Sequence, residues 1–316
     1  MNSSSKNNFL VSVIIPCYNV ENYIDECVES VQNQNYKYIE LICIDNASTD
    51  NTYQRLIKLK SKYNFKLYQC PSPGANNARN LGIKKSLGLW LQFLDADDIL
   101  YTDKINHQIN LIKNSKEDID FIVASSLHKD LKLKVNTSYP LEDKFIGLLK
   151  SNFGNTCSNL FKKQSLIEID CWNVNLKSSQ EYDLIFRMIK NDSKFILDLN
   201  PLTLVRERRF GQISIQNPKL KWNQYVKLRL EIINYLKQAE PSYYISNEMI
   251  INQILFDILR ILIKYDRYEA LRIHREYLYK FKPKKSPSNG TIYLIFYKIF
   301  GFELTEKIRS IFNLDS

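Results

Sequence analysis

Several features that would assign a protein class at once are scarce in this chain. Its three histidines, His107, His128 and His274, are far apart and show no metal-ligand spacing. Its six cysteines form no C-x-x-C pair, so we expect them to be reduced and to act as small hydrophobic side chains. These absences argue against a zinc site and a disulfide framework, and they favour a reducing compartment.

Long apolar runs are absent as well. No stretch approaches the roughly 20 apolar residues that are needed to cross a bilayer. The apolar run Phe9–Ile15 is short and fits the first strand of a domain, so we expect no signal peptide. We therefore expect a cytoplasmic protein.

Positive charge is unevenly distributed along the chain. The net charge is +10 over 316 residues, and residues 216–316 hold 17 Lys and Arg against 10 Asp and Glu, a net of +7. With 44% apolar residues, the chain can bury a full core and exceeds the usual size of one domain. We therefore expect a main domain followed by a basic appendage.

Strand and helix patterns alternate over the first hundred residues. A β-branched run, VSVIIP, begins at Val11, and a helical spacing of apolar residues follows over Val20–Val31. A second apolar strand ends at Asp45, a third spans Phe65–Cys70, and a fourth precedes Asp95. This alternation predicts right-handed crossovers and a parallel sheet, with the ligand-binding loops at the carboxyl ends of the strands.

The fourth strand leads into the most informative motif, LWLQFLDADDIL. Its three carboxylates, Asp95, Asp97 and Asp98, raise one another's pKa unless a cation is shared among them. Oxygen ligands of this kind suit Mg²⁺ or Mn²⁺ completed by substrate phosphates. The alternative is an acidic turn, and we expect Asp98 to cap the helix that begins near Tyr101.

Two segments carry a resemblance to a known family. VSVIIPCYNVENYIDECVESVQNQNYKYIELICIDNASTDNT and GANNARNLGIKKSLGLWLQFLDADDIL, which together cover about Phe9–Leu100, resemble the amino-terminal half of a family 2 glycosyltransferase with the GT-A fold. SSQEYDLIFRMIK, at Ser178–Lys190, is a weaker match. The resemblance implies an α/β fold with a Rossmann-like, mostly parallel sheet and helices on both faces. The expected parts are a disordered segment over 1–8, a catalytic domain over 9–215 and a basic helical C-terminal region over 216–316.

The resemblance also assigns residues to the donor site. Pro16, Tyr18 and Asp45 would line the nucleotide pocket, with Tyr18 against the base and Asp45 accepting a hydrogen bond from its edge. Arg79 would contact the base or the phosphates, and Asp95 would face the ribose. The alternatives stay open: a partly buried loop tyrosine, a turn-capping aspartate, and a surface arginine paired with a neighbour.

The resemblance assigns the metal and the catalytic base in the same way. Asp97 would hold Mg²⁺ or Mn²⁺ on the diphosphate, where charge develops as the nucleotide departs. The family usually has Glu-Asp where this chain has Gln180-Glu181, so Glu181 would be the general base. The alternative for Glu181 is a first-turn acid that complements the helix dipole. Asp183 and Arg187 have the spacing of an i, i+4 ion pair.

These assignments predict an inverting, metal-dependent glycosyltransferase of the hexosyltransferase type. The donor would be a nucleoside-diphosphate sugar, with a UDP-sugar favoured, and the acceptor a hydroxyl of a glycan or lipid-linked glycan in cell-surface polysaccharide synthesis.

One residue departs from the family pattern, because Arg209 stands where a metal-site histidine is often found. A second hypothesis, a metal-dependent nucleotidyltransferase, would usually bring a glycine-rich phosphate loop after the first strand, and PCYN is not one. A third, a non-catalytic basic nucleic-acid-binding protein, conflicts with the acidic cluster.

The basic tail leaves two kinds of partner open. KFKPKKSP, at Lys280–Pro287, precedes the aromatic run TIYLIFYKIFGF at Thr291–Phe302. This combination is typical of attachment to an anionic membrane surface, here the inner face of the cell membrane. The side chains expected to insert are Tyr293, Phe296, Tyr297 and Phe300. The alternative is a helical appendage that packs on the catalytic domain or on a second subunit as a homodimer.

Overall fold

The computed structural model describes residues 9–208, 217–286 and 288–312. The chain divides into two compact units: unit 1 is Met1–Leu176 with Gln180–Gln212, and unit 2 is Lys177–Ser179 with Ile213–Ser316. The expected disorder of the first eight residues and the expected domain boundary after residue 215 both fall outside the described residues.

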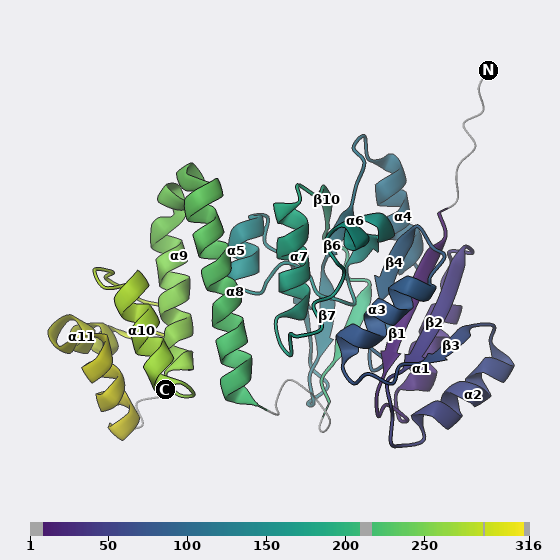
Figure 1. Cartoon of the computed structure of the whole chain (residues 1–316), viewed down its shortest axis with the longest axis horizontal. Helices are drawn as coiled ribbons and strands as arrows, with labels where there is room; N and C mark the ends of the chain where they lie inside the picture. The colour runs from purple at the N-terminus through teal and green to yellow at the C-terminus, as the bar shows by residue number, and fades with distance from the viewer. Residues whose placement is uncertain (1–8, 209–216, 287, 313–316) are drawn as a thin grey trace. The chain divides into compact units, whose positions relative to one another are not determined.

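Unit 1 alternates strands and helices along the chain (Figure 1). In chain order its elements are β1 Val11–Cys17, α1 Ile24–Gln32, β2 Ile39–Asp45, α2 Thr52–Lys62, β3 Lys66–Gln69, α3 Ala75–Lys85, β4 Trp90–Phe93, β5 Ile99–Leu100, α4 Lys104–Asn114, β6 Phe121–Ala124, β7 Ser126–Lys129, β8 Val135–Ser138, α5 Lys144–Leu149, β9 Leu160–Lys162, α6 Lys163–Glu168, α7 Gln180–Lys190, β10 Phe195–Asp198 and β11 Thr203–Arg206. The larger sheet has the strand order β10-β6-β9-β4-β1-β2-β3, and the smaller one β5-β11-β7-β8. In the larger sheet only the pairs that include β9 are antiparallel, so the predicted mostly parallel sheet is confirmed.

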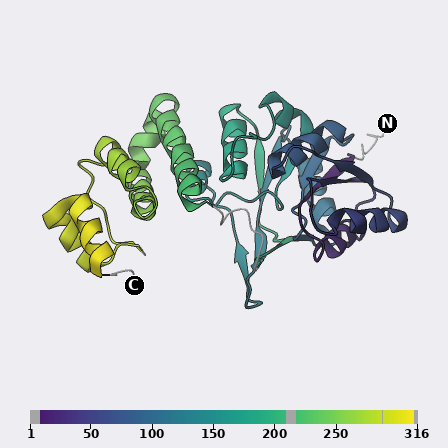
Figure 2. The same ribbon diagram turned by 60° about the horizontal axis from the view of Figure 1, so that its bottom comes forward.

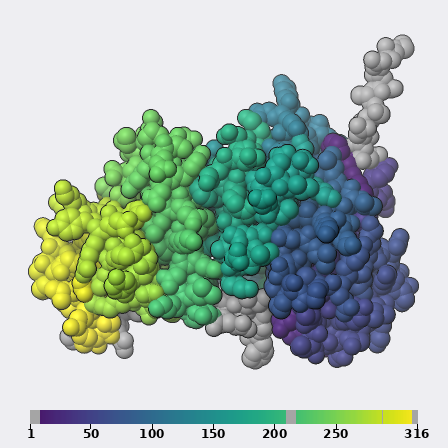
Figure 3. All heavy atoms as spheres, in the orientation of Figure 1, coloured from purple at the N-terminus to yellow at the C-terminus, as the bar shows by residue number. Residues whose placement is uncertain are grey.

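Different helices cover the two faces of the larger sheet (Figure 2). Successive side chains of a strand point to opposite faces. Val13 and Ile15 of β1 belong to a buried cluster with residues of α1, α2 and α4. Ile14 meets α3 on the other face, where a Cβ atom on Gly82 would lie 2.3 Å from its Cγ2 atom. The space-filling view shows the helices of unit 1 closing over the strands on the face displayed (Figure 3). Five of the six free cysteines are buried, as expected for small hydrophobic side chains.

The carboxyl ends of the central strands meet at one edge of the larger sheet. Cys17 at the end of β1 is in register with Asp45 at the end of β2. β4 pairs with β1 and ends shortly before Asp95. Asn46 connects the loops, because its N–H donates to the Cys17 carbonyl (2.8 Å) and its Oδ1 accepts the N–H of Gly74 (2.7 Å). The predicted convergence of the strand-end loops is therefore confirmed.

The smaller sheet brings a distant part of the chain to the acidic motif. β5 follows the motif directly, and Leu100 pairs with Thr203 of β11 in antiparallel register. β11 ends at Arg206, whose N–H donates to Oδ1 of Asp98 (2.9 Å). The sequence did not predict this sheet, because β5 has only 2 residues and shows no alternation of its own.

Unit 2 is helical, as its apolar periodicity predicts. Its helices are α8 Pro218–Ala239, α9 Pro241–Leu262, α10 Arg267–Tyr277 and α11 Thr291–Phe312. Phe256 of α9 lies at the centre of an aromatic cluster that includes side chains of α10 and α11. A buried carboxylate, Glu306, is paired with Arg260 (2.9 Å) and Arg309 (2.9 Å). The pair with Arg260 ties the second half of α11, beyond the kink at Gly301 (φ +69°), to α9.

The aromatic helix α11 has an inner and an outer face. Tyr293 donates to Oε1 of Glu306 (2.7 Å), and the ring of Tyr297 lies 5.3 Å from that of Phe256. The prediction that these two tyrosines insert into a membrane is therefore wrong, because both face the core of unit 2. The exposed apolar side chains in the first half of the helix are Ile292, Ile295, Ile299 and Phe300. Among the described helices, none combines the length and the apolarity that a membrane span requires.

Candidate active site

Asp98 connects the acidic motif to neighbouring segments of the chain through buried hydrogen bonds. Its side chain is buried, Oδ1 accepts the N–H of Arg206 (2.9 Å), and Oδ2 accepts from the thiol of Cys157 (3.2 Å). Burial, together with repulsion from Asp97 and Asp95, raises the pKa of Asp98 well above its ordinary value. The expectation that Asp98 caps the next helix is wrong, because its carboxylate holds the end of β11 rather than the first turn of α4.

Asp97 is held by two arginines at and just beyond the end of β11. Nε of Arg208 forms an ion pair with Oδ2 of Asp97, and the two side chains are 12% and 14% exposed. Nε of Arg206 donates to the carbonyl oxygen of Asp97, and its Nη1 pairs with Glu26. Both guanidinium groups lie over the ring of Tyr23. The distance to the ring centre is 5.5 Å for Arg206 and 5.2 Å for Arg208. The predicted metal ligand therefore has a cationic partner within this chain.

Arg79 joins the acidic motif to α7. Its side chain is 6% exposed, and Nη2 pairs with Oδ1 of Asp95 (2.8 Å). Nη1 donates to Oδ1 of Asn76 (3.0 Å) and to Oε1 of Gln180 (3.0 Å). The guanidinium lies 4.7 Å from the ring centre of Trp172. The alternative of a surface arginine is therefore wrong, because Arg79 is a buried bridge between two segments of the predicted site.

Glu181 lies in the first turn of α7, directly after the glutamine that Arg79 binds. Its side chain is half-buried. Asp183, the next acid in the helix, is paired with Arg187 (2.7 Å), as the i, i+4 spacing predicts.

The residues predicted to bind the nucleotide lie at the ends of β1 and β2. Tyr18 is 46% exposed, and Pro16 is half-buried next to the last residue of β1. Asp45 is buried, and among the described residues its Oδ1 has no hydrogen-bond partner. Asp45 does not cap α2, which begins several residues later at Thr52. A buried carboxylate oxygen without a partner is an acceptor that a ligand N–H would satisfy.

Three residues of the site were not predicted from the sequence. Trp172 packs edge-on against Phe93 at 5.2 Å, Cys157 lies beside the buried aspartate of the motif, and Arg208 pairs with the expected metal ligand. Trp172 and Cys157 lie in a stretch without a recognisable motif, whereas the run RERR was a visible signal for Arg208. Arg209, the arginine expected near the metal, lies outside the described residues.

The donor atoms of the acidic motif suit a divalent cation. Ligand atoms of Asp95, Asp98 and Cys157 lie within 4.8 Å of one another. Both carboxylate oxygens of Asp98 already accept hydrogen bonds within the chain, Oδ1 from the Arg206 N–H and Oδ2 from the Cys157 thiol. Asp95 and Asp97 remain as oxygen ligands, which Mg²⁺ and Mn²⁺ prefer. The residues present therefore fit the expected metal.

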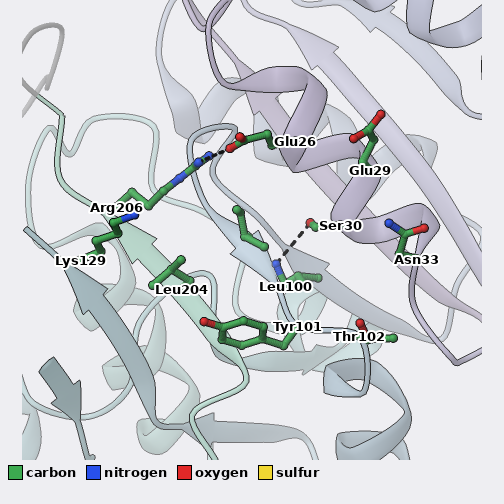
Figure 4. Close-up of a pocket in the computed structure, with 11 residues that line it drawn as sticks. Glu26, Glu29, Ser30, Asn33, Leu100, Tyr101, Thr102, Lys129, Leu204 and Arg206 are labelled. Atoms are coloured by element: carbon green, nitrogen blue, oxygen red, sulfur yellow. Dashed lines mark hydrogen bonds and ion pairs between the residues drawn. The ribbon is translucent and has the colours of Figure 1, made fainter. Parts of the chain in front are cut away.

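A hollow of about 490 Å³ lies on unit 1 between α1 and the smaller sheet (Figure 4). Glu26 and Ser30 line it from α1, and Leu204 and Arg206 line it from β11. Ser30 accepts the N–H of Leu100 (3.3 Å) at its floor. The residues predicted to bind donor and metal do not line this hollow, so we treat it as separate from the candidate active site.

Comparisons with known proteins agree with this architecture. A family model described as glycosyl transferase family 2 matches residues 12–169. An uncharacterized glycosyltransferase of Rickettsia bellii is 31% identical over 75% of this chain and 37% of its own length. The Escherichia coli protein WfaP, described as UDP-Glc:alpha-D-GlcNAc-diphosphoundecaprenol beta-1,3-glucosyltransferase, is 39% identical over 34% of this chain and 43% of its own.

Solved structures share the fold. The crystal structure of residues 1–349 of S. aureus TarS in complex with UDP-GlcNAc matches with a TM-score of 0.60 and 19% identity, over 85% of this chain and 76% of that one. Together with the family model, this match confirms the expected GT-A type α/β fold. The chain spans between 31% and 60% of the length of the Rickettsia glycosyltransferases that it matches.

Proposed function

Because the chain belongs to glycosyl transferase family 2, we propose that it is an inverting, metal-dependent glycosyltransferase. It takes a sugar from a nucleoside-diphosphate donor, with a UDP-sugar favoured, and transfers it to a hydroxyl of a glycan or lipid-linked acceptor in cell-surface polysaccharide synthesis. Two likenesses support this choice of substrates. The TarS crystal structure is a complex with UDP-GlcNAc. The name of WfaP gives UDP-Glc as the donor and a GlcNAc-diphosphoundecaprenol as the acceptor.

The observation that carries the proposal is the bridge made by Arg79. One buried guanidinium binds Asp95 of the acidic motif (2.8 Å) and Gln180 at the start of α7 (3.0 Å). Glu181 is therefore held in the helical turn next to the motif that would bind the leaving group. A transferase needs these two functions side by side, whereas the described residues offer nothing that favours nucleotidyl transfer or nucleic-acid binding.

Donor binding follows from the strand-end residues. Tyr18 offers an exposed aromatic face to the base, and Oδ1 of Asp45 accepts an N–H from its edge. Pro16 backs this pocket at the end of β1. Asp95 accepts from the ribose hydroxyls through the oxygen that Arg79 leaves free, so Arg79 acts as a positioning residue.

Asp97 would hold Mg²⁺ or Mn²⁺, which when bound stabilises the negative charge of the departing diphosphate. The chemical step itself needs a base. Glu181 takes the proton of the acceptor hydroxyl, whose oxygen attacks the anomeric carbon as the bond from that carbon to the diphosphate oxygen breaks on the opposite face. The proton ends on Glu181, the electron pair on the nucleoside diphosphate, and the anomeric configuration is inverted.

The proposal is tested by separating donor binding from turnover. We expect Asp97→Asn to lose Mn²⁺-dependent binding of UDP, because it removes a charged ligand. Glu181→Gln keeps size and hydrogen bonding but cannot accept a proton, so turnover should fall by about 10² or more with UDP binding nearly unchanged. Calorimetry with UDP and with GDP, and turnover of UDP-sugars on GlcNAc-diphosphoundecaprenol, measure the two effects.

A matched control for these variants is Glu117→Gln, at a side chain that is 66% exposed and pairs only loosely with Lys194 (3.7 Å). This control should match the parent in both assays. Near-parent turnover of Glu181→Gln would move the base elsewhere, and UDP affinity that is independent of both Mn²⁺ and Asp97 would refute the metal assignment.

We also propose that α11 attaches the protein to the anionic inner face of the cell membrane. Exposed lysines precede the helix, each worth about 1 kcal/mol near such a surface. These lysines are Lys280, Lys282, Lys284 and Lys285. The exposed apolar residues of the first half of α11, among them Ile295 and Ile299 at 54% and 66%, form the inserting face.

Vesicle sedimentation tests the membrane proposal on the full chain. Ile295→Glu combined with Ile299→Glu should abolish binding to vesicles that contain phosphatidylserine, and added salt should weaken the binding of the parent. The control is Ile311→Glu, at a residue that is 65% exposed in the other half of the helix. If the parent ignores anionic vesicles but sediments as a dimer that the double variant disrupts, the face is a subunit interface.

A further inference from the structure

The negative charges of Asp95 and Asp97 are each paired with an arginine, and the two arginines differ in how many other groups they contact. Asp95 pairs with Arg79, which two further acceptors and an indole ring hold in place. Asp97 pairs with Arg208, for which the described part of the chain offers one hydrogen-bond acceptor, this carboxylate, and one ring, that of Tyr23. Within the described part of the chain, Arg208 therefore has fewer partners than Arg79 or Arg206.

We propose that Arg208 is a tethered cation that occupies Asp97 until a divalent ion binds and then moves to the diphosphate of the donor. The inference rests on the proposed function, because it takes Asp97 as the metal ligand and a nucleoside diphosphate as the ligand. It adds a role for a residue of this chain that the family resemblance does not assign.

Displacement follows from the geometry of the ion pair. Nε of Arg208 contacts Oδ2 of Asp97, and both side chains are largely buried. A divalent ion on the same carboxylate would put two cations within a few ångströms in a site with little water, where their repulsion is strong. Arg208 lies just beyond the last residue of β11, so its side chain can leave without disturbing the hydrogen bond from Arg206 to Asp98 (2.9 Å).

The diphosphate is the anion that restores the lost pairing. A guanidinium group matches phosphate oxygens with two parallel hydrogen bonds, and it remains charged at all working pH values. The donor's diphosphate would arrive at the ion on Asp97, within reach of the displaced side chain. Arg208 would thus disfavour metal binding alone and favour metal and nucleotide together.

Arg206 provides a matched control two residues away. It carries the same charge and lies over the same tyrosine ring, but its guanidinium binds the Asp97 carbonyl oxygen and Glu26 rather than the Asp97 carboxylate. Replacing Arg206 by a neutral residue changes the electrostatic potential at the site but leaves the ion pair between Arg208 and Asp97 in place. A comparison of the two arginines therefore separates occupancy of Asp97 from general electrostatics.

The test is direct titration of the full-length protein in two steps. Free Mn²⁺ is measured by electron paramagnetic resonance without nucleotide, and UDP binding is then measured by calorimetry at saturating Mn²⁺. We expect Arg208→Gln to bind Mn²⁺ about tenfold more tightly, because Mn²⁺ no longer competes with an arginine for Asp97. The same variant should bind UDP about tenfold more weakly, because it has lost the guanidinium group that would contact the diphosphate. Arg206→Gln should change either affinity by less than about threefold.

Arg208→Lys keeps the charge and the fold in case the glutamine variant misfolds. It should stay within about threefold of the parent for Mn²⁺ but lose UDP affinity, because an ammonium group lacks the two-pronged geometry. Unchanged Mn²⁺ affinity in Arg208→Gln, or equal tightening in Arg206→Gln, overturns the inference. A parent protein that binds Mn²⁺ but never UDP would instead overturn the proposed donor, and with it the second half of this exchange.

Discussion

Replacement of Arg79 by lysine is the sharpest test of how the site is held together. The guanidinium makes three hydrogen bonds, to Asp95 (2.8 Å), Asn76 (3.0 Å) and Gln180 (3.0 Å), and it lies over Trp172. An ammonium group at the same place can retain one of these partners but cannot span all three. The variant keeps the charge, so any loss reports geometry.

The expected loss can be worked from the partners. Each bond to a neutral acceptor contributes about 1 kcal/mol, and the ring contact contributes up to about 2 kcal/mol in a desolvated site. The ion pair itself is discounted, because the side chain of Asp95 is 40% exposed and water can replace the lost contact. We therefore expect Arg79→Lys to lower the free energy of unfolding of unit 1 by about 3 kcal/mol, or about 6–12 °C in Tm.

Tryptophan fluorescence during urea unfolding measures this loss. In a Trp222→Phe background, the reporters are Trp90 and Trp172, both buried in unit 1. The matched control is Arg55→Lys, whose partner is Asp25 (2.6 Å) and whose side chain is 45% exposed, so the change should be below about 1 kcal/mol. Equal losses in Arg79→Lys and Arg55→Lys would refute the bridge. Turnover should fall as well, by about tenfold or more, because the start of α7 shifts relative to the donor.

Two further predictions concern the packing beneath the site. Gly82→Ala should lower the free energy of unfolding of unit 1 by about 1–3 kcal/mol in the same assay, because its Cβ atom would lie 2.3 Å from Cγ2 of Ile14. Lys104→Met should raise that free energy, because the buried ammonium group has no hydrogen-bond partner in the described structure and burial lowers the pKa of Lys104 to about 7. Between pH 7 and about 10.4 the unfolded lysine binds a proton that the folded one does not, so the parent gains stability as pH rises and the advantage of Lys104→Met should shrink. Urea unfolding at pH 7 and at pH 9.5 measures this difference, and an advantage that grows with pH would contradict the argument.

The parts of the fold that follow from local pattern could be predicted from the sequence. β1 is a β-branched run, and the helices that flank the central strands have regular apolar spacing, so the parallel sheet and its convergent loops follow from alternation alone. The smaller sheet could not be predicted in this way. β5 has 2 residues, and it becomes a strand because Leu100 meets Thr203 about a hundred residues later. Contacts of that range leave no period in the sequence.

In the candidate site, too, the residues placed by local pattern were predictable from the sequence, and those placed by long-range contacts were not. Residues at strand ends, such as Asp45 and Asp97, were visible because their position in the order of elements marks them. The partners that fix them were not, because Trp172 and Arg208 reach the site only through the folded chain. Asp98 was misread as a helix cap for this reason, since the N–H that it accepts belongs to β11.

The Gln180-Glu181 pair explains how the site balances its charges. Where the family resemblance places Glu-Asp, this chain has an amide followed by a carboxylate. The amide oxygen accepts from Arg79 (3.0 Å) without adding negative charge, so the guanidinium charge remains available to Asp95. A carboxylate at position 180 would compete with Asp95 for Arg79 and would repel the carboxylate of Glu181 beside it. The amide therefore lets Arg79 hold the acidic motif and the start of α7 together.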